Sequence, residues 1–212
     1  MADTATLTLN GSPGQGGFSG IGSDYVIMNA DDSIAALHVY GVQQPGGTYT
    51  SSEAWLSGTG TLTVGSPYTA YCHGDGTATA CPCGNASTTG GCANGTGDGA
   101  TLSGTGLASI MSDTLVLQGT GLIASQPGLY FQGNNAINSG AGIQFGDGLR
   151  CAGGGVVRLQ VRFAGGAGAS ATTADIAAKG GVVPGDVKRY QLWYRNPSSS
   201  ICGSQFNLTN GM

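Results

Sequence analysis

The sequence predicts an all-β protein, an antiparallel β-sandwich or jelly roll with long Gly-rich loops and three disulfides. Glycine supplies 41 of the 212 residues without the three-residue period of collagen. Short runs of alternating apolar and polar residues recur along the chain, as half-buried strands require. The six cysteines are an even number, as expected of a disulfide framework. Charged residues make up only 8% of the chain, whereas disordered chains are rich in charge.

The strand predictions follow from alternation. Leu7 and Leu9 alternate with threonines near the amino terminus, and Val157–Phe163 is the clearest strand. In that strand one face would be core and the other wet or in contact with a partner. The expected core face is Val157, Leu159, Val161 and Phe163, and the opposite face is Arg158, Gln160 and Arg162. Further strands are expected within residues 24–29, 34–42, 60–65, 113–118, 128–132 and 190–195, and a short helix only within 172–179.

Cysteine usage divides the chain. Residues 1–66 lack cysteine and form an amino-terminal β segment, either strands of the same sandwich or a small β domain of their own. Residues 67–212 form a Cys-rich β domain.

Four of the cysteines lie close together in a loop-rich cluster, at Cys72, Cys81, Cys83 and Cys92. Structural zinc sites use cysteine pairs two to four residues apart, which this spacing matches poorly, so disulfides are favoured over metal. Four cysteines allow three pairings, and the sequence does not choose among them. If the four pair among themselves, Cys151 and Cys202 pair with each other.

Charge is unevenly distributed. Residues 1–149 hold nine acidic residues and no Lys or Arg, a net charge of −9. Residues 150–212 have a net charge of +5, which gives −4 for the chain. Either two halves of one sandwich attract each other, or the acidic and basic faces of neighbouring subunits meet head to tail. The candidate assembly face consists of Arg158, Arg162, Arg189 and Arg195.

Other candidate sites are few. Trp193 and Tyr194 could stack against sugars, one from each face of their strand. Asp24, Asp31 and Asp32 are a weak calcium candidate beside the simpler interpretation of a solvated turn.

Several classes of function are disfavoured by the sequence. There is no nucleophile elbow, and Glu53 is the single Glu, so no catalytic residues are assigned and an enzyme is not expected. We expect no cofactor. A chain with seven basic residues and a net negative charge does not suit nucleic acid, and no run approaches the ~20 apolar residues of a membrane span.

Residues 71–212 resemble a known family, the Gly- and Cys-rich domain at the carboxyl ends of large secreted planctomycete and myxobacterial proteins. The segments that resemble it begin at Cys72 (CHGDG), Ala80 (ACPCGN), Gly91 (GCAN), Asp113 (DTLVL), Leu129 (LYFQG), Phe145 (FGDGLRC), Tyr190 (YQLWYRNP) and Phe206 (FNLTNG). The resemblance implies secretion and a β-rich, cysteine-bridged fold, and it supplies no catalytic residues. Similar domains usually continue past the last segment with a short strand. Either this sequence stops short of that strand, or the carboxyl terminus is processed, or a neighbouring molecule supplies the strand.

These observations predict a secreted structural protein that self-assembles through head-to-tail contacts of β domains, as an extracellular filament or a surface layer. The alternative is a carbohydrate-binding or adhesive module of a larger secreted protein. The expected partners are copies of the chain itself or glycans. Because Met1 leads straight into a strand pattern, we expect a secretion signal to have been removed.

Overall fold

The structure is a computed structural model of the chain. It describes residues 6–9, 26–34, 36–39, 42–44, 46–65, 68–108, 110, 113–197 and 200–212. The chain divides into two compact units, Met1–Pro67 and Tyr68–Met212.

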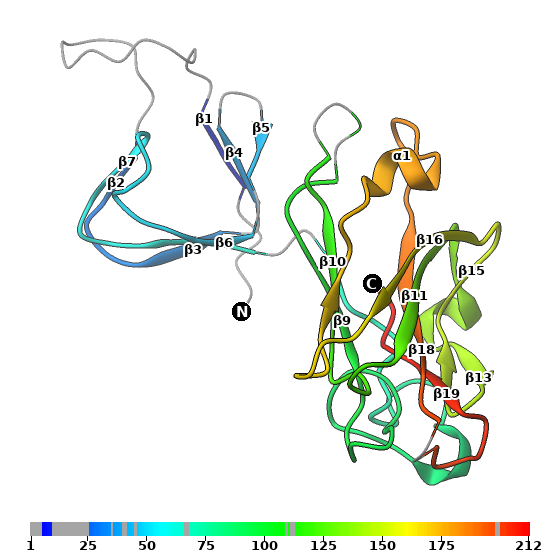
Figure 1. The fold of residues 1–212 in the computed structure, drawn as a ribbon. Helices are drawn as coiled ribbons and strands as arrows, with labels where there is room; N and C mark the ends of the chain where they lie inside the picture. Colours follow the sequence, from blue (N-terminus) through cyan, green and yellow to red (C-terminus); the bar gives the residue numbers. More distant parts are fainter. Residues whose placement is uncertain are drawn as a thin grey trace. The chain divides into compact units, whose positions relative to one another are not determined.

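The amino-terminal unit is built from short strands (Figure 1). They are β1 (Thr6–Leu9), β2 (Val26–Met28), β3 (Asp32–Ile34), β4 (Ala36–Val39), β5 (Val42–Gln43), β6 (Gly47–Tyr49), β7 (Leu56–Gly58) and β8 (Leu62–Val64). Three pairs of these strands are parallel, namely β1 with β4, β2 with β7 and β3 with β8.

All three parallel pairs share one register. The partners are Thr6 and Ala36, Val26 and Leu56, and Asp32 and Leu62, so every pair is offset by thirty residues. A constant offset between parallel strands is the geometry of a β-solenoid, in which one coil of chain stacks on the next. We call β1, β2 and β3 the first coil, and β4, β7 and β8 the second coil. The sequence analysis did not predict this repeat.

The core of the amino-terminal unit lies inside the coils. Leu37, Leu56 and Leu62 of the second coil are almost fully buried. The two coils approach closely at Gly60, where a Cβ would collide with the carbonyl oxygen of Ala30. The second coil also has neighbours on its other edge, since β5 pairs antiparallel with β4 and β6 pairs antiparallel with β8.

The carboxyl-terminal unit contains two larger sheets. A three-stranded sheet has the order β17 (Ser170–Ala171), β10 (Val116–Thr120), β9 (Thr101–Thr105). A four-stranded sheet has the order β16 (Val157–Phe163), β11 (Pro127–Gly133), β18 (Arg189–Arg195), β19 (Phe206–Leu208). The smaller elements are β12 (Asn135–Ala136) paired with β15 (Ala152–Gly153), β13 (Ile143–Phe145) paired with β14 (Gly148–Arg150), and the short helices η1 (Pro82–Gly84), η2 (Ile137–Gly140) and α1 (Ile176–Gly180).

One hydrophobic core joins the two larger sheets. Leu117 of β10 and Leu192 of β18 are both fully buried in it. The hydroxyl of Tyr130, on β11, accepts a hydrogen bond from Gly119 N on β10 at 3.1 Å and lies 2.8 Å from the carbonyl oxygen of Ser170. The predicted all-β class with a sandwich-like arrangement and three disulfides is therefore confirmed.

The predicted helix is present but shorter than its sequence window. Helix α1 begins at Ile176, after the Asp175 carboxylate caps the backbone N–H of Ala178 at 2.8 Å. The first backbone N–H groups of a helix have no acceptor within the helix. One of these, Ala177 N–H, donates instead to Asp113 Oδ2 at 2.7 Å.

The last residues of the chain also pair as strand. Tyr190 and Met212 exchange backbone hydrogen bonds, and so do Tyr71 and Gly211. The end of the last segment is thus paired within the chain itself.

Candidate interaction face and its stapled support

The six cysteines form three disulfides, as predicted, but with a different connectivity. The pairs are Cys72–Cys151, Cys81–Cys92 and Cys83–Cys202. The expected Cys151–Cys202 bridge is therefore wrong. One bridge, Cys81–Cys92, lies within the cluster. The other two join the cluster to the large sandwich, through Cys151 directly after β14 and through Cys202 in the loop after β18.

A buried carboxylate supports the same region and was missed by the sequence analysis. Asp147 is fully buried and accepts hydrogen bonds from Ser204 Oγ at 2.6 Å, Ser204 N at 3.2 Å and Ser200 Oγ at 2.7 Å. Asn196 Nδ2 lies 3.5 Å from the carboxylate. Burial alone would raise the pKa of Asp147, but the hydrogen bonds from Ser204 and Ser200 outweigh it and hold the pKa below the ordinary value. The carboxylate thus anchors Ser200 and Ser204, which stand on either side of Cys202.

A β-bulge in β16 changes which side chains face outward. Tyr130 of β11 pairs with Gln160, whereas its neighbour Phe131 pairs with Arg158. Leu159 is thus the extra residue, and it is buried in the core. The alternation is consequently shifted beyond the bulge.

This shift corrects the predicted core face of β16. Val161 is 58% exposed and Phe163 is 68% exposed, so neither belongs to the core. Both lie on the outer face of the four-stranded sheet. There Val161 pairs with Leu129, and Leu129 pairs in turn with Trp193 of β18.

The outer face is continued by aromatic side chains. The rings of Trp193 and Phe206 are 5.5 Å apart between centroids, and those of Phe206 and Phe145 are 5.2 Å apart. Phe145 is 43% exposed. We define the outer apolar face as Leu129, Phe145, Val161, Phe163, Trp193 and Phe206. Contiguous exposed apolar surface of this kind marks a site of interaction.

Strand pairing puts three of the predicted assembly arginines, Arg158, Arg189 and Arg195, on the outer face with Trp193, whereas Arg162 is on the other face. Arg158 is exposed beside Phe131. Arg189 and Arg195 lie at opposite ends of β18, seven residues long, which separates them by about 20 Å at strand spacing. The bulge places Arg162 opposite Gly128, and its Nε is buried without a hydrogen-bond partner among the described residues.

The two proposed sugar-stacking residues separate in the structure. Trp193 is half-buried on the outer face. Tyr194 is 1% exposed, with its hydroxyl 2.9 Å from Asn94 Nδ2, so it is a core residue and cannot meet a ligand. Burial raises the pKa of its hydroxyl.

Two residues of the weak calcium candidate, Asp31 and Asp32, lie in the described part of the chain. Asp24 lies outside the described residues. The Asp31 carboxylate accepts two hydrogen bonds from Thr61, from N and from Oγ1, each at 2.9 Å, and these bonds lower its pKa. Asp32 Oδ1 accepts from Ser33 N at 2.8 Å. Asp31 therefore joins the two coils, and no cluster of metal-binding side chains occurs among the residues that the structure describes.

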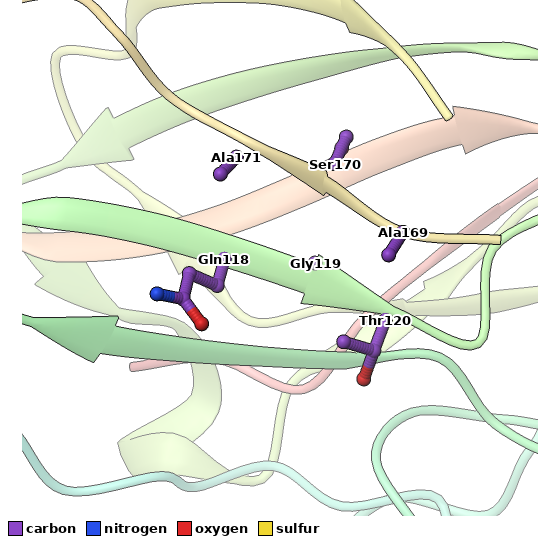
Figure 2. A pocket seen from close by; sticks show the side chains of 6 residues that line it. All are labelled: Gln118, Gly119, Thr120, Ala169, Ser170 and Ala171. Carbon is purple, nitrogen blue, oxygen red and sulfur yellow. The ribbon is translucent and has the colours of Figure 1, made fainter. Parts of the chain in front are cut away.

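A shallow hollow lies beside β10 and β17 (Figure 2). Its lining carries the hydroxyls of Thr120 and Ser170 but no acid, base or thiol beside them that could activate a hydroxyl as a nucleophile. These residues are Gln118, Gly119, Thr120, Ala169, Ser170 and Ala171.

No family model, curated protein or solved structure matches the chain. The resemblance to carboxyl-terminal domains of secreted bacterial proteins stays a prediction. In the described part of the chain, no helix is long and apolar enough to span a membrane.

Proposed function

We propose that this chain is a secreted structural protein that self-associates through the outer apolar face of its carboxyl-terminal unit, as a filament or a surface layer. The observation that carries the proposal is the exposure of Val161 and Phe163 in a face that continues through Trp193 to Phe145. Apolar side chains that face water contribute no hydrophobic stabilisation, and burying them against a partner supplies it.

Charge supports a head-to-tail contact. The amino-terminal unit has five acidic residues and no Lys or Arg, whereas the carboxyl-terminal unit has seven basic and six acidic residues. The single ion pair among described residues is Lys188–Asp186, at 3.2 Å. Arg158 is exposed and lies on the same face of β16 as Val161. An acidic unit of one copy can therefore meet the arginine-bearing sheet of the next, and a heterologous contact of this type propagates.

Three disulfides support secretion, since such bonds persist in oxidising compartments. The proposal includes no catalysis and no cofactor. It also includes no binding of nucleic acid, because the chain has a net charge of −4 and phosphate contacts need a dense basic face.

Sedimentation velocity over a range of protein and salt concentrations, together with electron microscopy, tests the proposal. We expect wild-type protein to form open-ended assemblies, and Phe163→Ser to weaken them while the fold is retained. Val187→Thr is the matched control, because Val187 is exposed to a similar extent, 64%, but lies outside the face. Monomers under all conditions, or assemblies unaffected by Phe163→Ser, would count against self-association.

Carbohydrate binding is the second candidate, and the aromatic row of Trp193, Phe206 and Phe145 is the observation that favours it. Aromatic side chains at a surface combine an apolar body with specific geometry. A glycan array with wild-type protein and with Trp193→Ala and Phe145→Ala separates the candidates. A glycan signal that both variants remove favours the adhesive module, and a flat response on all sugars eliminates it.

A further inference from the structure

Among the residues that the structure describes, no strand pairs with the outer edge of the first coil of the amino-terminal unit. In each of the three sheets, a strand of the first coil stands at the end of the order: β1 in β1-β4-β5, β2 in β2-β7 and β3 in β3-β8-β6. The opposite edges of β4 and β8 are occupied by the antiparallel strands β5 and β6. Among the described strands, β4 and β8 of the second coil are therefore covered on their far side, β7 is not, and none of the three first-coil strands is.

Burial differs between the coils in the same columns. Leu7 stacks on Leu37 and Val26 stacks on Leu56. Leu37 and Leu56 are 0% and 3% exposed, whereas Leu7 and Val26 are only half-buried. The columns of Leu7 and Val26 are thus less covered at the first coil, whereas Leu9 and Ile34 are buried there, at 6% and 8% exposed. Solenoid coils are stabilised by neighbours on both sides, and a terminal coil needs a cap.

We propose that this edge binds a further coil of parallel β-solenoid with the same thirty-residue period. The contact would continue the interface that already joins the two coils. Its strands would pair in parallel with β1, β2 and β3. Its inner side chains would be apolar above Leu7, Leu9 and Val26.

The acidic residues at this edge indicate which polar groups the partner coil should carry, and they argue against a second copy of this chain. Asp31 and Asp32 are exposed beside β3, and the amino-terminal unit contains no Lys or Arg. Two copies that met edge to edge would add acidic residues to acidic residues, with no base in either unit to neutralise them. A coil with a hydroxyl or an ammonium above these carboxylates fits better, as Thr61 shows on the other side of Asp31.

The stacking geometry suggests a direct test with the full-length chain. Thr6 pairs with Ala36, thirty residues on, so a tandem duplication of residues 6–35 adds a coil in register. In the added copy, Asp31→Thr and Asp32→Lys supply the donors. We expect hydrogen exchange of the β1 and β2 amides to slow at least about tenfold, because amides at an open edge gain partners.

The matched control is the same duplication with Leu7→Pro and Val26→Pro in the added copy, which removes strand pairing at equal length. Equal exchange in the two proteins would overturn the proposal. Whether a second copy occupies the edge is tested in the unduplicated chain carrying Phe163→Ser, the variant in which we expect association through the outer apolar face to be weakened. Protection of β1 that rises with protein concentration in that variant would also overturn it.

Discussion

Replacement of Asp147 by asparagine should destabilise the carboxyl-terminal unit in a pH-dependent manner. The carboxylate is fully buried and accepts three hydrogen bonds of 3.2 Å or less, from Ser200 and Ser204. Hydrogen bonds to charged groups contribute about 1.5–3 kcal/mol each. Asparagine keeps one acceptor oxygen and turns an amide group toward the remaining hydroxyl donors. We therefore expect a loss of about 3 kcal/mol at neutral pH, which corresponds to a Tm lower by roughly 6–12 °C.

The pH dependence separates the charge from simple packing. The pKa of Asp147 in the folded protein lies below its ordinary value, so its stabilisation is complete above the unfolded pKa of about 3.9. It is lost as pH falls through the lower folded pKa. The difference in unfolding free energy between wild type and Asp147→Asn should thus be constant from about pH 7 to pH 5 and shrink below about pH 4.

Urea unfolding at several pH values measures this difference. Asp98→Asn is the control, because Asp98 is exposed and its replacement should change stability by less than about 0.5 kcal/mol. The reasoning fails if Asp147→Asn costs less than about 1 kcal/mol at neutral pH, or if its cost persists undiminished in acid.

Three further predictions concern the same unit. Replacing Cys72 and Cys151 by alanine opens a link across 79 residues and should cost about 4–5 kcal/mol by chain entropy; urea unfolding that shows no loss would refute this. Leu192→Ala, at a fully buried position, should cost about 2–5 kcal/mol, whereas Val161→Ala should cost under about 1 kcal/mol, and equal costs would contradict the outward position of Val161. Burial raises the pKa of Tyr190 to about 12, so the contribution of Tyr190 to stability should be complete below about pH 10 and decline as pH rises toward about 12. Ultraviolet titration of the phenolates measures it, and ionisation of all tyrosines near pH 10 would exclude the shift.

Alternation in the sequence was sufficient to locate strands but not to orient all of them. The window 128–132 lies within β11 and the window 190–195 within β18. In β16 the same alternation placed Val161 and Phe163 in the core. One extra residue, Leu159, reverses the faces beyond it, and a bulge depends on the partner strand, which is not visible in a single sequence.

The disulfide connectivity could not be predicted for a similar reason. Sequence spacing gave no means to choose between bonds within the cluster and bonds to the sandwich. The choice follows from buried asparagines that hold the cluster against the sheets. Asn207 Nδ2 donates to the carbonyl oxygens of Cys92 and Ala93 at 3.2 and 3.1 Å, and Asn85 Nδ2 donates to Asp147 O at 2.8 Å.

The thirty-residue repeat was missed because little of it is visible in the residue types. The inner residues correspond, with Leu7 above Leu37 and Leu9 above Val39. The outward residues do not correspond, since Thr8 stands above His38. Solenoids are recognised by several repeats of one pattern, and the described strands form only two coils.

The boundary between the units also changes the electrostatic argument for assembly. The sequence analysis divided the charge at residue 149 and obtained −9 and +5. Division at Pro67, where the structure separates the units, gives −5 and +1. The carboxyl-terminal unit is therefore close to neutral, and long-range attraction between copies is weaker than the first division implied. Apolar contact must then contribute most of the association free energy. Association should consequently respond more strongly to Phe163→Ser than to a rise in salt that screens charges beyond about 8–10 Å.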